Sequence, residues 1–101
     1  MDGFSLETPE QVSRKLAARV KALRLAKGWK QITLAERSGV SLASLRRFEE
    51  SGRVSLQSLL DLAFALNRLD DFDALLQPPR AASLAELEKA EKRPARKRGR
   101  I

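Results

Sequence analysis

Apolar residues recur every three or four positions over much of the chain, which is the spacing of one face of an α-helix. The first run begins at Pro9, where Thr8 stands as a candidate N-cap and Gln11 closes a capping box. Gly28 is placed to end this helix near Lys27. The sequence therefore predicts a first helix over these residues. Its apolar face consists of Leu16, Val20 and Leu23.

The same spacing predicts four further helices. Ser55 is the candidate N-cap of the fourth helix, and Pro78 and Pro79 follow the fifth. No β-hairpin signal is present, so we expect an all-α domain of five helices over residues 9–77. The predicted spans are about 31–38, 42–50, 56–66 and 70–76. The apolar face of the fourth helix consists of Leu56, Leu59, Leu60, Ala63 and Leu66.

Residues 31–49 carry the pattern of two short helices that cross at a tight turn. Ala35 is small enough to lie where two helices touch, and Gly39 tolerates the positive φ that such a turn requires. Ser41 is a suitable N-cap for the second of these helices. The apolar positions that face inward are Leu34, Val40, Leu45 and Phe48.

This pattern resembles the Cro/C1-type (lambda-repressor-like) helix-turn-helix family of bacterial and phage repressors, over roughly Val12 to Leu76. Ser38 departs from the larger apolar residue of many members, and residues 50–54 form a shorter loop than usual. The resemblance implies that the chain binds double-stranded DNA in the major groove. It also implies that Glu49 pairs with Arg24 of the first helix. The matching residues are Gln31, Ala35, Gly39, Ser41 and Glu49.

The third predicted helix turns Ala43, Arg46 and Arg47 outward when Leu45 is placed at the centre of its inward face. An arginine guanidinium can donate two hydrogen bonds, to O6 and N7 of guanine, which is the commonest specific contact with a base. Arg47 lies closer to the centre of the exposed face, so we assign it to a base and Arg46 to the DNA backbone or its edge. Ala43, together with Leu42, is a candidate for an apolar contact with the methyl group of a thymine. The alternative is that both arginines are solvated or paired with nearby acids.

Backbone phosphates require donors around the reading helix. The resemblance assigns Gln31 to a phosphate and to bracing the reading helix. Lys30, Ser41 and Arg53 border the same face, although ordinary surface charge explains Lys30 and Arg53 nearly as well. The complete set of predicted DNA-binding residues is Lys30, Gln31, Ser41, Leu42, Ala43, Ser44, Arg46, Arg47 and Arg53.

Several aromatic and aliphatic residues lie outside these patterns. We interpret Trp29, in the turn before the second helix, as a residue that plugs the core rather than one that stacks on a base. Phe64, Phe72, Leu75 and Leu76 exceed what a core of this length needs. They are therefore candidates for the seam of a homodimer, with closure of the core as the alternative.

Composition narrows the function classes. The chain of 101 residues has no cysteine and no histidine, which removes disulfides, thiolate zinc ligands and the commonest general base. We therefore expect no enzyme, no cofactor and no metal site. The sequence has no apolar run of membrane-spanning length and no signal peptide, so we expect no membrane contact and a cytoplasmic, nucleoid-associated location.

The net charge of +7 is concentrated near the C-terminus. Residues 1–79 hold 12 Lys and Arg against 10 Asp and Glu, whereas residues 80–101 hold 8 against 3. We expect residues 1–8 to be flexible and residues 78–101 to form a mobile, partly disordered basic tail. Ser83 and Glu86 form a second capping box there, which opens a short amphipathic helix to about Lys92. Its apolar stripe, Leu84, Leu87 and Ala90, is too small to hold it folded alone.

Together these features predict a sequence-specific repressor that binds a palindromic operator as a homodimer. Within the family the chain is most similar to HipB-type antitoxins, on the strength of Pro78-Pro79, the Ser-Leu-x-Glu-Leu segment from Ser83 and the Arg-Lys-rich end. That resemblance implies a partner, a HipA-like serine/threonine kinase toxin. The alternatives are a stand-alone phage-type repressor or restriction–modification controller, and an RNA or ribosome adaptor.

Overall fold

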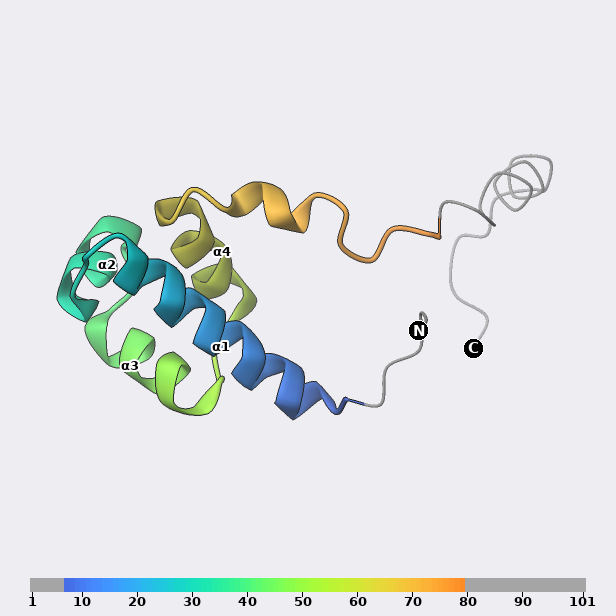
Figure 1. Cartoon of the computed structure of the whole chain (residues 1–101), viewed down its shortest axis with the longest axis horizontal. Helices are drawn as coiled ribbons and strands as arrows, with labels where there is room; N and C mark the ends of the chain where they lie inside the picture. The colour runs from blue at the N-terminus through green and yellow to red at the C-terminus, as the bar shows by residue number, and fades with distance from the viewer. Residues whose placement is uncertain (1–6, 80–101) are drawn as a thin grey trace.

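The computed structural model describes residues 7–79, which form a helical domain with no strand in that range (Figure 1). A long first helix is followed by three shorter ones and a single 3-10 turn. Figure 1 shows α1 running across the domain, with α2 near its C-terminal end, α3 below it and α4 above it in this view. The elements are α1 (Pro9–Ala26), α2 (Gln31–Ser38), α3 (Leu42–Ser51), α4 (Leu56–Ala65) and the 3-10 helix η1 (Leu69–Phe72).

The predicted helix starts are confirmed. The Thr8 hydroxyl accepts from the Gln11 amide at 3.1 Å, and the Gln11 side chain accepts from the Thr8 amide at 2.9 Å. Ser41 caps α3 and Ser55 caps α4, each accepting a backbone N–H three residues later at 3.0 Å. Because each cap depends on residues only three apart, these boundaries could be recognised without knowledge of the fold.

The core lies where α2, α3 and α4 meet the middle of α1. Leu34, Leu45 and Phe48 are fully buried, as the turn pattern predicted, and Ala35 is buried beside them. The prediction for α4 was less accurate. Leu62 is fully buried although it was not assigned to the apolar face. Leu56, which was assigned to that face, is largely exposed.

Trp29 packs against the core, and its ring is only partly exposed. The prediction that it plugs the core is confirmed. The ring also lies close to two cations, with Lys27 Nζ 5.3 Å and the Arg37 guanidinium carbon 4.6 Å from its centre. These contacts fix the turn between α1 and α2.

The prediction of a fifth α-helix over residues 70–76 was wrong. The chain forms only the four-residue 3-10 helix η1 and then irregular turns, so the described domain has four α-helices. Asn67 adopts a φ of 62°, no side chain caps η1, and Phe72 is only partly buried. Without a cap or a buried face, the unfavourable nucleation of so short a helix is not offset.

The domain boundaries predicted at residues 8 and 78 fall at the edges of the described range. The N-terminal segment up to residue 6, the basic tail from residue 80 and the predicted helix Ser83–Lys92 lie outside the described residues. Within residues 7–79, no helix combines the length and apolar character needed to cross a membrane. In the same range, no cluster of three His, Cys, Asp or Glu side chains is arranged to hold a metal ion.

Candidate nucleic-acid interface

The turn between α2 and α3 has the geometry that the sequence predicted. Gly39 adopts a φ of 80°, and its amide donates to the Ala35 carbonyl at 2.9 Å. Ser38 contributes to the same turn, because its hydroxyl donates to the Ala35 carbonyl at 3.3 Å and accepts from the Val40 amide at 3.1 Å. The serine at this position therefore satisfies turn groups that a larger apolar residue could not.

A buried ion pair fixes α3 against α1. Arg24 Nε donates to Glu49 Oε2 at 2.8 Å, and Arg24 Nη2 donates to Glu49 Oε1 at 2.9 Å. The two side chains are only 7% and 4% exposed. Arg24 Nη1 donates to the Trp29 carbonyl, and Gln31 Nε2 donates to Glu49 Oε1 at 3.0 Å. The predicted pair is confirmed, and its contacts join α1, the following turn, α2 and α3.

The ionisation of Glu49 reflects this network. Burial would raise the pKa of Glu49, but the hydrogen bonds from Arg24 and Gln31 and the charges of Arg24 and Lys21 outweigh it. The pKa of Glu49 therefore lies below its ordinary value. The carboxylate is charged at neutral pH and holds α3 in one orientation against α1.

The outward face of α3 is exposed along its length. Ala43, Ser44, Arg46 and Arg47 are all exposed, whereas Leu42 is half-buried and packs against the core. Arg46 and Arg47 make no ion pair within residues 7–79, although Glu50 follows closely on the same helix. The alternative in which nearby acids of the domain neutralise these arginines is therefore not realised in the described part of the chain.

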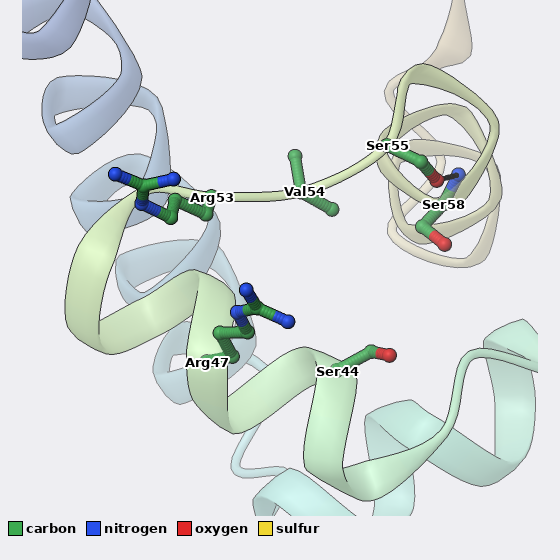
Figure 2. Close-up of a pocket in the computed structure, with 6 residues that line it drawn as sticks. All are labelled: Ser44, Arg47, Arg53, Val54, Ser55 and Ser58. Atoms are coloured by element: carbon green, nitrogen blue, oxygen red, sulfur yellow. Dashed lines mark hydrogen bonds between the residues drawn. The ribbon is translucent and has the colours of Figure 1, made fainter.

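An open hollow of about 300 Å³ lies between the exposed face of α3 and the start of α4. Figure 2 shows the Arg47 side chain directed into this space, with Ser44 beside it and Ser55 and Ser58 across from it. Arg53 forms another edge. We call this space the α3–α4 hollow. No carboxylate is among its lining residues. Its lining residues are Ser44, Arg47, Arg53, Val54, Ser55 and Ser58.

The sequence predicted three of these six residues as DNA-binding, namely Ser44, Arg47 and Arg53. It did not predict Val54, Ser55 and Ser58. Ser55 had been recognised as the N-cap of α4, and helix N-termini favour anions because their first N–H groups have no intrahelical partner. The cap at Ser55, together with this preference for anions, could have identified the start of α4 as a candidate site.

The remaining predicted residues surround the same face. Lys30 is exposed at the N-cap position of α2 and makes no capping bond. Gln31 uses one amide N–H for Glu49, which leaves a second N–H available. The Ser41 hydroxyl accepts from the Ser44 amide and donates to Ser44 Oγ at 2.9 Å, so it is engaged in capping. The structure brings Ser44, Arg47 and Arg53 together, while Lys30 and Gln31 lie at the start of α2.

The comparison with protein families agrees with this geometry. A model of the helix-turn-helix family matches residues 20–72, just over half of the chain. The match includes α2, α3, the turn between them and all residues that line the α3–α4 hollow. No curated protein and no solved structure matches the chain.

Proposed function

Because the chain belongs to the Cro/C1-type helix-turn-helix family, whose domains bind double-stranded DNA and regulate transcription, we propose that it is a sequence-specific repressor. The observation that carries the proposal is the α3–α4 hollow, where two arginines and a helix N-terminus converge on the exposed face of α3. In this proposal α3 enters the major groove, with Ala43 and Arg47 toward base edges and Leu42 at its margin. In this proposal the protein acts on DNA in the cytoplasm.

The hollow suggests which residues contact DNA phosphates and which contact base edges. In this proposal Arg53 and the first N–H groups of α4 hold a backbone phosphate, which is supported by their position at the hollow. Arg47 lies one turn after Ser44 on α3 and reaches the adjacent base edge. Arg46, which does not line the hollow, contacts the neighbouring backbone. Lys30 and Gln31 add phosphate contacts from the start of α2, whereas the Ser41 hydroxyl already donates its proton to Ser44 Oγ.

We expect the two arginines of α3 to give different binding signatures. Arg47→Ala should cost about 1–3 kcal/mol at the operator and relax the preference at one base pair in each half-site. Arg46→Ala should weaken binding to all sequences alike and flatten the salt dependence by about one unit. Binding isotherms on operator and scrambled duplexes across a salt series measure both effects. Wild-type binding by both variants would remove α3 as the reading element.

A homodimer is the second part of the proposal. Leu56, Leu60 and Phe64 lie four residues apart on α4 and form a continuous apolar ridge, which we call the α4 ridge. Phe64 is 72% exposed, and Leu76 beyond η1 is 97% exposed, so neither closes the core. A twofold axis through such a ridge pairs the same surface of two copies and presents two α3 helices to a palindrome.

Phe64→Asp should dissociate the dimer and leave the fold intact, because Phe64 is already exposed in the isolated domain. We expect a monomer by sedimentation equilibrium and at least about tenfold weaker binding to a palindromic operator, since one half-site no longer supports the other. Ile32→Asp is the matched control, because Ile32 is an exposed apolar residue on α2, away from the ridge. Equal association of both variants and the wild type would place the interface elsewhere.

A finer proposal is that the repressor is the antitoxin of a HipBA-like operon and neutralises a serine/threonine kinase toxin. Its support is the similarity of Pro78-Pro79 and the following tail to HipB-type sequences. Purification of the full chain from its native operon, followed by mass spectrometry, tests this directly. A co-purifying kinase-like protein supports the antitoxin, whereas a chain that purifies without one is a stand-alone regulator.

A further inference from the structure

An apolar groove of about 670 Å³ lies between α1 and α4, away from the α3–α4 hollow. Residues of α1 form one wall, residues of α4 form the other, and the chain around η1 closes one end. Within residues 7–79, no segment covers it. The groove takes its apolar lining from Leu16, Val20, Leu23, Leu56, Leu59, Ala63, Leu66, Phe72 and Leu75.

Phe72 and Leu75, which the sequence assigned to a fifth α-helix, line this groove. The residues that follow α4 form only η1 and turns, which leave Leu56 and Leu75 largely exposed at the groove. An apolar groove between two helices is a surface on which the apolar face of an amphipathic helix can dock. The question is which segment covers it.

We infer that the groove receives the chain's own C-terminal segment Ser83–Lys92, docked as a short amphipathic helix. The segment opens with a capping box and has an apolar stripe on one face, but the stripe is too small to hold a helix alone. A preformed apolar groove supplies the missing contacts. This is the usual way in which an amphipathic helix is recognised.

The dimensions of the segment and the groove agree. Leu16 and Leu23 mark the ends of the α1 wall, about 10 Å apart along a helix, and Leu84 to Ala90 rises about 9 Å. The eight residues 76–83 separate the groove residue Leu75 from Leu84, and such a length reaches about 25 Å when extended. The tether is thus long enough for docking on the same molecule and short enough to give a high effective concentration.

Charge favours the same pairing. On a helical projection, Glu86 and Glu88 flank the apolar stripe of the segment. The groove edge carries Arg19, which makes no ion pair within residues 7–79. Arg68 and Asp71, also at the edge, pair with each other at 3.0 Å. The acidic flanks of the segment therefore meet an available cation.

A second copy is the competing occupant, and the lining argues against it. Leu60 and Phe64 of the α4 ridge are not part of the groove, and only Leu56 is shared. A dimer formed through the α4 ridge leaves the α1 wall uncovered. Intramolecular docking covers that wall and leaves Phe64 free for the partner.

Amide hydrogen exchange of the full chain tests the inference. We expect the amides of residues 84–92 to exchange at least about tenfold more slowly than in an isolated peptide of residues 80–101. The double variant Leu84→Asp/Leu87→Asp should lose this protection. Lys89→Asp is the matched control, because it changes the net charge by the same amount on the opposite face of the segment, and it should keep the protection.

A groove-side pair of variants and a dilution series complete the test. Ala22 is exposed on α1 and lines the groove, so Ala22→Glu should reduce protection of the segment without unfolding the domain. Ala18→Glu places the same charge on the same helix outside the lining and should not. Protection should be independent of protein concentration. Protection that disappears on dilution would assign the groove to a second copy, and unprotected amides at every concentration would overturn the inference.

Discussion

Arg24→Met should lower the free energy of unfolding by about 3–5 kcal/mol, because it leaves the Glu49 carboxylate buried without its cation. The substitution also removes the donor to the Trp29 carbonyl, which holds the turn before α2. A domain of this size has a total stability of roughly 5–15 kcal/mol, so the loss is a large fraction of it. Urea denaturation at neutral pH, followed by circular dichroism, measures the change.

Two further variants distinguish the effect of breaking the ion pair from the effect of removing a long side chain. Arg14→Met removes another arginine of α1, whose partner Glu10 and own side chain are 73% and 59% exposed, and should cost less than about 1 kcal/mol. Arg24→Met/Glu49→Leu removes both charges and should recover much of the stability. If Arg24→Met were no more harmful than Arg14→Met, the pair would not hold α3 in place.

The same pair predicts the response to acid. Because the pKa of Glu49 is lower in the folded state than its ordinary value of 4.5, its contribution to stability is complete above that value. As the pH falls below 4.5, the unfolded chain takes up a proton before the folded protein does, and the contribution is lost toward the folded pKa. Glu49→Gln should therefore be less stable at pH 7 and show a flatter loss of stability in acid.

The sequence predicted best the features that depend on neighbouring residues. Thr8, Ser41 and Ser55 were recognisable as caps because each acts on an amide three residues away. Gly39 was recognisable because few other residues adopt its backbone conformation without strain. The Arg24–Glu49 pair spans 25 positions, and only the family resemblance indicated it.

The errors occurred where packing between distant segments decides the outcome. Leu56 and Leu62 are both leucines of α4, and periodicity alone does not tell which side of the stripe faces α2. The predicted fifth helix had a suitable pattern, but burial of its apolar residues depends on a tertiary partner. Ser58 joins the candidate interface only because the loop after α3 places the start of α4 beside Arg47. No local pattern contains that information.

Gly52→Ala should destabilise the domain by about 2–5 kcal/mol, through two additive effects. Gly52 ends α3 with a φ of 82°, a conformation that costs an L-residue about 1–2 kcal/mol. A Cβ atom there would also lie 3.0 Å from the Arg14 nitrogen and from the Ser13 carbonyl carbon, both in the backbone of α1. Because helix backbone yields less readily than a side chain, relief of the overlap requires α3 and α1 to separate, at a further cost of about 1–3 kcal/mol.

Gly39→Ala is the matched control, because it carries the first effect alone. Gly39 has a nearly identical φ of 80°, but beyond its own immediate chain neighbours no atom lies within 4 Å of the position that its Cβ would occupy. We therefore expect Gly39→Ala to lose only the backbone contribution, so that the difference between the two variants measures the contact of α3 with α1. Gly52 directly precedes Arg53, and a shift at this point would also move one edge of the α3–α4 hollow. Gly52→Ala should then weaken DNA binding even under conditions where it remains folded, whereas equal stability losses in the two variants would show that α1 accommodates the added methyl group.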